Sequence, residues 1–135
     1  MNNILNVAVF AAAVAAALPA QAEVVVVVNP AAAASSMSKD EVAQYFLGKS
    51  SALAPVDQPE SAPLRAEFYK KVTDKDLSQA KTLWSKLVFT GKASMPKEMA
   101  GSAEVKKFVA ANPKAIGYID KSAVDATVKV VYTAP

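Results

Sequence analysis

Residues 24–28 read Val-Val-Val-Val-Val, and Asn29-Pro30 follows them. A strand built from an uninterrupted β-branched run is apolar on both of its faces, as a buried strand of a helix-covered sheet must be. The Asn-Pro pair is typical of a turn and ends the run. This stretch therefore predicts a buried strand in a domain whose sheet is covered by helices.

A capped helix follows a connection of small residues. Ser38-Lys39-Asp40-Glu41 has the form of a capping box, in which the serine hydroxyl accepts from the amide three residues on and the glutamate reaches back. Gly48 is placed to take a left-handed conformation at the end of this helix. The apolar residues at helical spacing are Val42, Tyr45 and Phe46.

Further strands and helices alternate along the rest of the chain. A short extended piece at 54–57 contains Pro55, which restricts it to a sheet edge or to the first position of a strand. We expect a second helix from near Ser61 with Pro63 in its first turn, and a third helix that starts between residues 73 and 78 and ends at Gly91. The residues expected to face inward are Leu64, Phe68 and Val72 in the second helix and Leu77, Ala80, Trp84, Leu87 and Val88 in the third.

The last third of the chain predicts a loop, a helix and two strands. Residues 92–101 have no periodicity and are expected to form a loop, after which Ser102 is expected to cap a helix with Val105, Phe108 and Val109 inward. Residues 115–119 and 128–132 are expected to be strands, the second a half-exposed edge. The whole pattern predicts one α/β domain in residues 23–135, with a small mixed or mostly parallel sheet flanked by helices.

The composition favours binding over catalysis. The chain has no His and no Cys, which excludes a histidine-based triad, a thiolate nucleophile, a disulfide and any metal site built on these ligands. No activated nucleophile or general base is evident among the carboxylates, lysines and hydroxyls that remain. We therefore expect a protein that is not an enzyme and has no cofactor and no metal.

The charge is mild and evenly spread. There are 15 Lys plus Arg against 12 Asp plus Glu, giving a net charge of +3, and Arg65 is the single arginine. Lysines are spread from Lys39 to Lys129 and interleaved with acidic residues. A patch rich in arginine is missing, so a nucleic-acid partner is not expected.

Residues 1–22 have the pattern of a secretory signal peptide. The apolar run from Val7 to Leu18 is short for a membrane span, and Ala20-Gln21-Ala22 is a small-x-small cleavage pattern that would leave Glu23 at the mature N-terminus. The first residues carry no Lys or Arg, so an uncleaved anchor is the alternative. We expect a soluble exported protein of the bacterial periplasm.

Four stretches together resemble a known family. They are residues 25–29, residues 38–49 with Phe46-Leu47-Gly48-Lys49, residues 55–65, and Ala115-Ile116-Gly117-Tyr118. Their order and spacing resemble the phosphate-type periplasmic solute-binding proteins of ABC transporters, which have the type 2 periplasmic-binding fold. Members of that family are about twice as long and close two lobes over the ligand, so the resemblance implies that residues 23–135 form one lobe.

The resemblance also implies an oxyanion site where the second helix begins, and the chain departs from the family there. The family turn looks like Arg-x-x-Gly-Ser-Gly-Thr, whereas the equivalent turn here has no glycine and no preceding arginine. Depending on the register, Ser61 or Ala62 takes the place of the family serine. Pro63 lacks an amide, and Glu60 adds a negative charge.

The candidate ligand-binding residues are Ser61, Ala62, Arg65 and Asp57. Ser61 could instead be a plain helix cap, and Arg65 could replace the lost arginine or be an exposed helix residue. Asp57 could accept a proton from a bound hydrogen phosphate or form an Asx turn.

Two functions remain open from the sequence. The first is an exported, non-catalytic solute-binding-like protein that binds phosphate or another oxyanion weakly for an ABC-type uptake system. The second is a ligand-free periplasmic interaction module, whose partner would be a transporter, a membrane sensor or a second copy of the chain.

Overall fold

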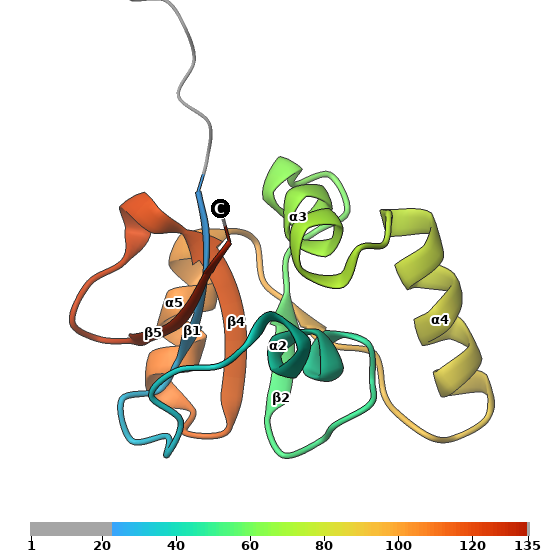
Figure 1. The fold of residues 1–135 in the computed structure, drawn as a ribbon, viewed down its shortest axis with the longest axis horizontal. Helices are drawn as coiled ribbons and strands as arrows, with labels where there is room; N and C mark the ends of the chain where they lie inside the picture. The colour runs from blue at the N-terminus through green and yellow to red at the C-terminus, as the bar shows by residue number, and fades with distance from the viewer. Residues whose placement is uncertain (1–22, 135) are drawn as a thin grey trace, which may run out of the picture.

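The structure is a computed structural model that describes residues 23–134, with a mixed five-stranded sheet at its centre (Figure 1). The expected signal peptide, residues 1–22, lies outside the described residues. The strands are β1 (Val24–Val28), β2 (Ala54–Asp57), β3 (Lys97–Glu98), β4 (Ala115–Asp120) and β5 (Lys129–Ala134). The α-helices are α2 (Lys39–Phe46), α3 (Pro63–Phe68), α4 (Leu77–Phe89) and α5 (Ser102–Ala111), with a π-helical turn η2 (Tyr69–Thr73) and a 3-10 turn η3 (Lys121–Ala123).

The strand order is β3-β2-β4-β1-β5. β2 runs parallel to β3 and to β4, whereas β1 runs antiparallel to β4 and to β5. The expected α/β class with a mixed sheet is therefore confirmed. β5 is at one end of the sheet and only partly buried, as expected for the closing edge strand.

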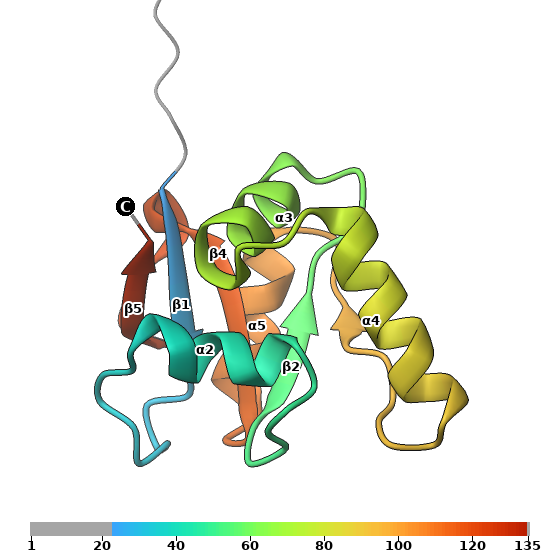
Figure 2. The same ribbon diagram turned by 45° about the vertical axis from the view of Figure 1, so that its right-hand side comes forward.

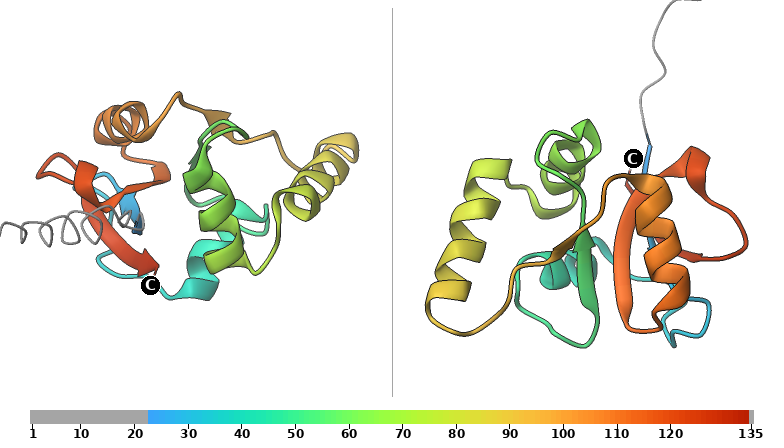
Figure 3. Two further views of the ribbon diagram at one scale, coloured as in Figure 1. Left: turned by 90° about the horizontal axis from the view of Figure 1, so that it is seen from above. Right: turned by 180° about the vertical axis from the view of Figure 1, so that it is seen from behind.

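The valine run forms β1, and both of its faces are buried as predicted. Val24, Val26 and Val28 belong to one buried cluster, and Val25 and Val27 belong to another on the opposite face. Helices α2 and α3 lie on one side of the sheet and α5 lies on the other (Figures 1 and 3). The sheet is therefore the middle of three layers.

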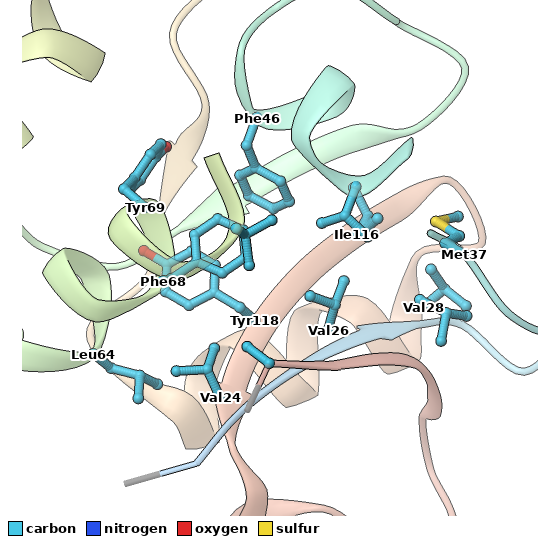
Figure 4. Close-up of a cluster of buried hydrophobic side chains, with 14 of the residues drawn as sticks. Val24, Val26, Val28, Met37, Phe46, Leu64, Phe68, Tyr69, Ile116 and Tyr118 are labelled. Atoms are coloured by element: carbon cyan, nitrogen blue, oxygen red, sulfur yellow. The ribbon is translucent and has the colours of Figure 1, made fainter. Parts of the chain in front are cut away.

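The face under α2, α3 and η2 is aromatic. Phe46 of α2, Phe68 of α3, Tyr69 of η2 and Tyr118 of β4 are fully buried there (Figure 4). The rings of Phe68 and Tyr118 are stacked with centroids 4.0 Å apart, and Phe46 meets Phe68 edge-on at 4.6 Å. Such contacts add to the area that the rings remove from water.

The face under α5 is aliphatic. Val105 and Val109 of α5 pack against the odd-numbered valines of β1 and against Val56 of β2. Gly117 of β4 lies directly below the helix, where an added Cβ would be 2.6 Å from Cγ1 of Val105. Close packing of α5 therefore accounts for this glycine.

The predicted helix starts are confirmed where they depend on residues that are close together in the sequence. Ser38 and Glu41 form the capping box, with Glu41 N to Ser38 Oγ at 3.2 Å and Ser38 N to Glu41 Oε1 at 3.0 Å. Gly48 follows with φ of 73°. Further along, α4 begins at Leu77 behind a second capping box of Asp76 and Gln79.

Four expectations about elements and helix ends are wrong. The second helix begins at Pro63, so its N-cap is Ala62 and not Ser61. The fourth helix already includes Ser102, because Gly101 is its N-cap and the Ser102 hydroxyl accepts from the amide of Asp120 at 3.0 Å. Residues 97 and 98 of the expected loop pair with β2 as a strand. Val88 is 42% exposed and faces away from the core.

Candidate functional site

A buried carboxylate lies at the C-terminal end of β2. Asp57 is 2% exposed and accepts hydrogen bonds from the hydroxyls of Tyr69, at 2.5 Å, and of Tyr118. The amide of Gln58 also donates to it at 3.0 Å. The two tyrosines come from the helical layer and from β4, so this carboxylate joins the sheet to its aromatic cover.

Arg65 of α3 lies beside this carboxylate and points into the protein. Its Nη1 donates to the carbonyl oxygen of Gln58 at 2.7 Å and to Oε2 of Glu98 at 3.2 Å. Its Nε is 3.7 Å from Oδ1 of Asp57, and this Nε is buried without a hydrogen-bond partner among residues 23–134. Arg65 is 7% exposed, so its guanidinium ties together α3, the end of β2 and β3.

The electrostatics of this cluster follow from its burial. Burial raises the pKa of Asp57, although hydrogen bonds from both tyrosines and the charge of Arg65 act in the opposite direction. Burial and the neighbouring carboxylate also raise the pKa values of Tyr69 and Tyr118. The two phenols therefore stay protonated at neutral pH and act as hydrogen-bond donors to Asp57.

The turn between β2 and α3, residues 59–62, follows Gln58, which contacts both Asp57 and Arg65. The amide of Ala62 donates to the Pro59 carbonyl at 2.9 Å, and the Ala62 carbonyl accepts from the Arg65 amide at 3.0 Å. Within residues 23–134, the amides of Glu60, Ser61 and Leu64 have no hydrogen-bond acceptor. Free amides of this kind are available to an anion or to water.

A lysine from α4 reaches the same turn. Lys81 Nζ is 3.2 Å from both carboxylate oxygens of Glu60, and both side chains are more than half exposed. The negative charge that the sequence places on the turn is thus offset by a cation from another helix.

The structure brings the four predicted site residues into one region but in two layers. Asp57 and Arg65 are in contact in the buried layer, whereas Ser61 is exposed on the turn and Ala62 is half-buried as the N-cap of α3. Arg65 is not an exposed helix residue. The hydroxyl of Ser61 caps no helix, and it stays a candidate ligand on the surface of the turn.

Sequence reasoning missed the other members of the region, which are Gln58, Tyr69, Tyr118, Glu98 and Lys81. Tyr69 follows Arg65 by four residues, so helical spacing could have placed both on one face. Glu98 and Lys81 come from β3 and α4, and nothing near them in the sequence points to this turn.

The described residues show no sign of a metal site or a membrane span. Among residues 23–134, no three acidic side chains gather where they could hold a metal ion. No helix in this part of the chain has the length and apolar character that crossing a membrane requires.

Comparison with known proteins gives matches to solved structures only. No family model matches the chain, and no curated protein matches it. An ABC-type phosphate transport receptor from Vibrio cholerae is similar in structure at 16% identity, with a TM-score of 0.63 over 82% of this chain. A protein from Clostridium perfringens, described as a phosphate ABC transporter substrate-binding protein and solved with bound phosphate, gives 18% identity and a TM-score of 0.65 over 82% of this chain.

PstS from Borrelia burgdorferi is similar at 11% identity with a TM-score of 0.61, and the match covers 82% of this chain and 46% of that protein. The match covers 45% of the Vibrio protein and 44% of the Clostridium protein. This chain thus spans less than half the length of each of these three proteins. The described residues therefore have the fold of one lobe of phosphate-type solute-binding proteins, as the sequence resemblance predicted.

Proposed function

We propose that this chain is an exported, non-catalytic, solute-binding-like protein that binds phosphate or a similar oxyanion weakly at the turn of residues 59–62. The observation that carries the proposal is a set of three free amides, those of Glu60 and Ser61 in the turn and that of Leu64 at the start of α3, next to the Gln58 carbonyl that Arg65 holds. Amides that converge in a turn can bind an anion without any charged side chain. Support also comes from the shared fold, because the similar Clostridium protein was solved with bound phosphate.

In this proposal the four candidate residues have two different roles. The hydroxyl of Ser61 and the amides around Ala62 contact the anion. Arg65 and Asp57 act as positioning residues, because the Arg65 guanidinium holds the Gln58 carbonyl and Asp57 anchors the adjacent amide. Without the side chain of Arg65 or of Asp57, the turn of residues 59–62 would lose a hydrogen bond that holds its conformation.

Binding at this turn is expected to be weak, at micromolar concentrations or above, for three physical reasons. Glu60 repels an anion, and its pairing with Lys81 offsets this charge only in part because the pair is exposed. Pro63 removes one donor. The chain forms one lobe, so a bound anion would stay open to solvent and to screening by salt.

The same proposal includes export of the chain to the periplasm, where it would serve an ABC-type uptake system. Its support is the signal-peptide pattern of residues 1–22 together with the fold. Intact-mass measurement on the periplasmic fraction tests export. A mature chain that starts at Glu23 is expected, whereas membrane-associated protein that retains residues 1–22 would indicate an anchor.

One observation favours the second function, a ligand-free interaction module. The guanidinium of Arg65 is engaged by Gln58 and Glu98, so its charge is directed into the protein and away from a ligand on the turn. In this alternative the fold has lost its solute, and the chain binds a transporter, a membrane sensor or a second copy of itself.

Calorimetric titration with phosphate, sulfate and a neutral sugar separates the two functions. Glu60→Gln removes the repelling charge and leaves Lys81 unpaired, so it should tighten phosphate binding about fivefold at low salt. Glu67→Gln is the matched control, because Glu67 also pairs with a lysine but lies further along the helix. It should leave the affinity unchanged.

Arg65→Ala should abolish phosphate binding through loss of the fixed turn. Thermal denaturation of the same variant shows whether it still folds. Binding that survives in folded Arg65→Ala would place the site elsewhere. If neither the wild-type protein nor Glu60→Gln binds any oxyanion, the interaction module is the better account.

A further inference from the structure

The most exposed large apolar side chains of the described residues gather at one end of α4. Phe89 is 91% exposed, Met95 48% and Val88 42%. Val88 and Phe89 end the helix, and Met95 lies in the loop that leads to β3. Figure 2 shows this end of α4 and its loop at the margin of the molecule, on the opposite side from β5. We call residues 86–95 the α4 tip.

The α4 tip is held so that these side chains cannot turn inward. Trp84 is 4% exposed, and its Nε1 donates to the Phe46 carbonyl at 2.8 Å. Leu87 packs on Gly48, where an added Cβ would be 2.3 Å from Leu87 Cδ1. Phe89 follows Leu87 by two positions, about 200° around the helix, and so points away from the protein. Because Trp84 and Leu87 hold one face of α4 against the protein, Phe89 on the opposite face stays exposed.

The α4 tip is also positively charged. Residues 77–97 contain four lysines and no acidic residue. Two of the four are engaged, since Lys81 pairs with Glu60 and Lys97 lies over the Phe108 ring. Lys86 and Lys92 are exposed and form no ion pair within residues 23–134. These two cations flank Phe89 in the sequence.

A polar hollow of about 310 Å³ adjoins the α4 tip. Its lining residues include Lys49, Lys92 and three serines beside apolar residues such as Leu53 and Trp84, and none of them is acidic. Ammonium and hydroxyl groups are donors suited to a phosphate oxygen. The hollow adds an anion-compatible surface directly beside the exposed apolar side chains.

We propose that the α4 tip docks on an anionic phospholipid surface. Phe89, Val88 and Met95 enter the boundary between headgroups and acyl chains, while Lys86 and Lys92 lie against lipid phosphates. Exposed apolar side chains flanked by lysines are a pattern that binds membrane interfaces, with affinity from buried apolar area and from charge. This inference concerns a surface remote from the turn of residues 59–62 and does not depend on oxyanion binding there.

A lipid surface fits the α4 tip better than a protein partner does. Three apolar side chains offer far less than the roughly 800 Å² per partner that a stable protein interface buries. They also project from the end of a helix and form no groove that would select a partner by shape. A charged lipid surface demands neither a large area nor a matching shape.

Flotation with lipid vesicles tests the proposal. The protein used should start at Glu23, because the apolar residues before it would bind vesicles themselves and residues 23–134 contain the complete sheet and both helical layers. Binding is expected to vesicles containing phosphatidylglycerol at low salt. Binding to pure phosphatidylcholine vesicles should be at least tenfold weaker, and added salt should weaken the binding to anionic vesicles.

Substitutions of exposed tip residues test whether the α4 tip is the part of the protein that binds the vesicles. Phe89→Ser should lower the partition coefficient at least tenfold, and it should leave the thermal midpoint unchanged because the side chain is exposed. The double variant Lys86→Gln with Lys92→Gln should lower it about thirtyfold. The matched control, Lys107→Gln with Lys114→Gln, removes the same charge from exposed positions on and after α5 and should lower it much less.

A fluorescent variant reports insertion directly. Phe89→Trp should show a blue-shifted emission in anionic vesicles, above the constant signal of the buried Trp84. Three results would each overturn the proposal: no binding to anionic vesicles at low salt, equal losses for the tip and control lysine variants, or a dimer that sedimentation shows to require Phe89. The last result would identify a second copy of the chain as the occupant of the tip.

Discussion

The two faces of the sheet have different side chains and different roles in the structure. The face under α2 and α3 is aromatic, with Phe46, Phe68, Tyr69 and Tyr118 in mutual contact (Figure 4). The buried residues of the face under α5 are valines with Ala115 and Ile119, and none of them is aromatic. The aromatic face places two hydroxyls, those of Tyr69 and Tyr118, on Asp57 at the end of β2.

This difference teaches where a binding site can form in the fold. A tyrosine fills the core with its ring and still offers a donor at its tip, so Asp57 can be buried and hydrogen-bonded at the same time. A valine layer offers no such donor. The turn of residues 59–62 begins one residue after Gln58, whose amide donates to Asp57 and whose carbonyl accepts from Arg65.

The largest effect should come from the centre of the aromatic face. Phe46→Ala removes a ring that is fully buried against three others and should cost about 3–5 kcal/mol of unfolding free energy. Urea denaturation measures it. Phe89→Ala deletes the same atoms from a position that is 91% exposed and should cost less than about 0.5 kcal/mol. Equal costs would mean that α2 does not pack on this face.

A smaller loss of unfolding free energy is expected on the aliphatic face, where the substitution affects only the packing of α5 against β4. Gly117→Ala places a methyl group 2.6 Å from Val105 Cγ1 and should destabilise the protein by about 1–3 kcal/mol. In a Val105→Ala background the new methyl has room, so the same substitution should cost much less. Additive costs in this double-mutant cycle would contradict the close approach of α5 and β4.

The smallest of these effects is expected at Asp57, where tyrosine hydroxyls of the aromatic face donate hydrogen bonds. Tyr69→Phe keeps the ring and removes one of the donors to Asp57, while Tyr118 and the Gln58 amide remain. We expect a loss of about 1 kcal/mol in unfolding free energy. If Tyr69→Phe also weakens phosphate binding, the hydrogen bonds to Asp57 help to hold the turn of residues 59–62 in its binding conformation. An unchanged stability would mean that water replaces the lost donor.

Local patterns allowed the sequence to predict most of the fold. The valine run of β1 is buried on both faces, and the capping box of Ser38 and Glu41 forms as expected, because each depends on neighbouring residues. Phe68 and Val72 are also buried as their spacing predicts, although η2 replaces the last turns of an ordinary helix. The resemblance to one lobe of a phosphate-type protein agrees with the structural matches.

Two of the errors, at β3 and at Ser102, share a physical cause, which is dependence on residues far along the chain. β3 is two exposed residues that form a strand only because β2 lies beside them. Ser102 was expected to cap its helix, but its hydroxyl accepts from Asp120 on β4. Arg65 turns inward toward Gln58 and toward Glu98 of that same short strand. The candidate site thus stays a prediction from sequence, and its division into a buried part and an exposed turn could not be predicted because it depends on these distant residues.

Backbone amide shifts measured by NMR during a phosphate titration test the central claim most directly. If the turn binds the anion, the largest shifts should be those of Glu60, Ser61 and Leu64, whose amides are free in the structure. The amides of β1 and α5 should not move. Shifts centred on the hollow at Lys49 and Lys92, or no shifts up to millimolar phosphate, would contradict the account.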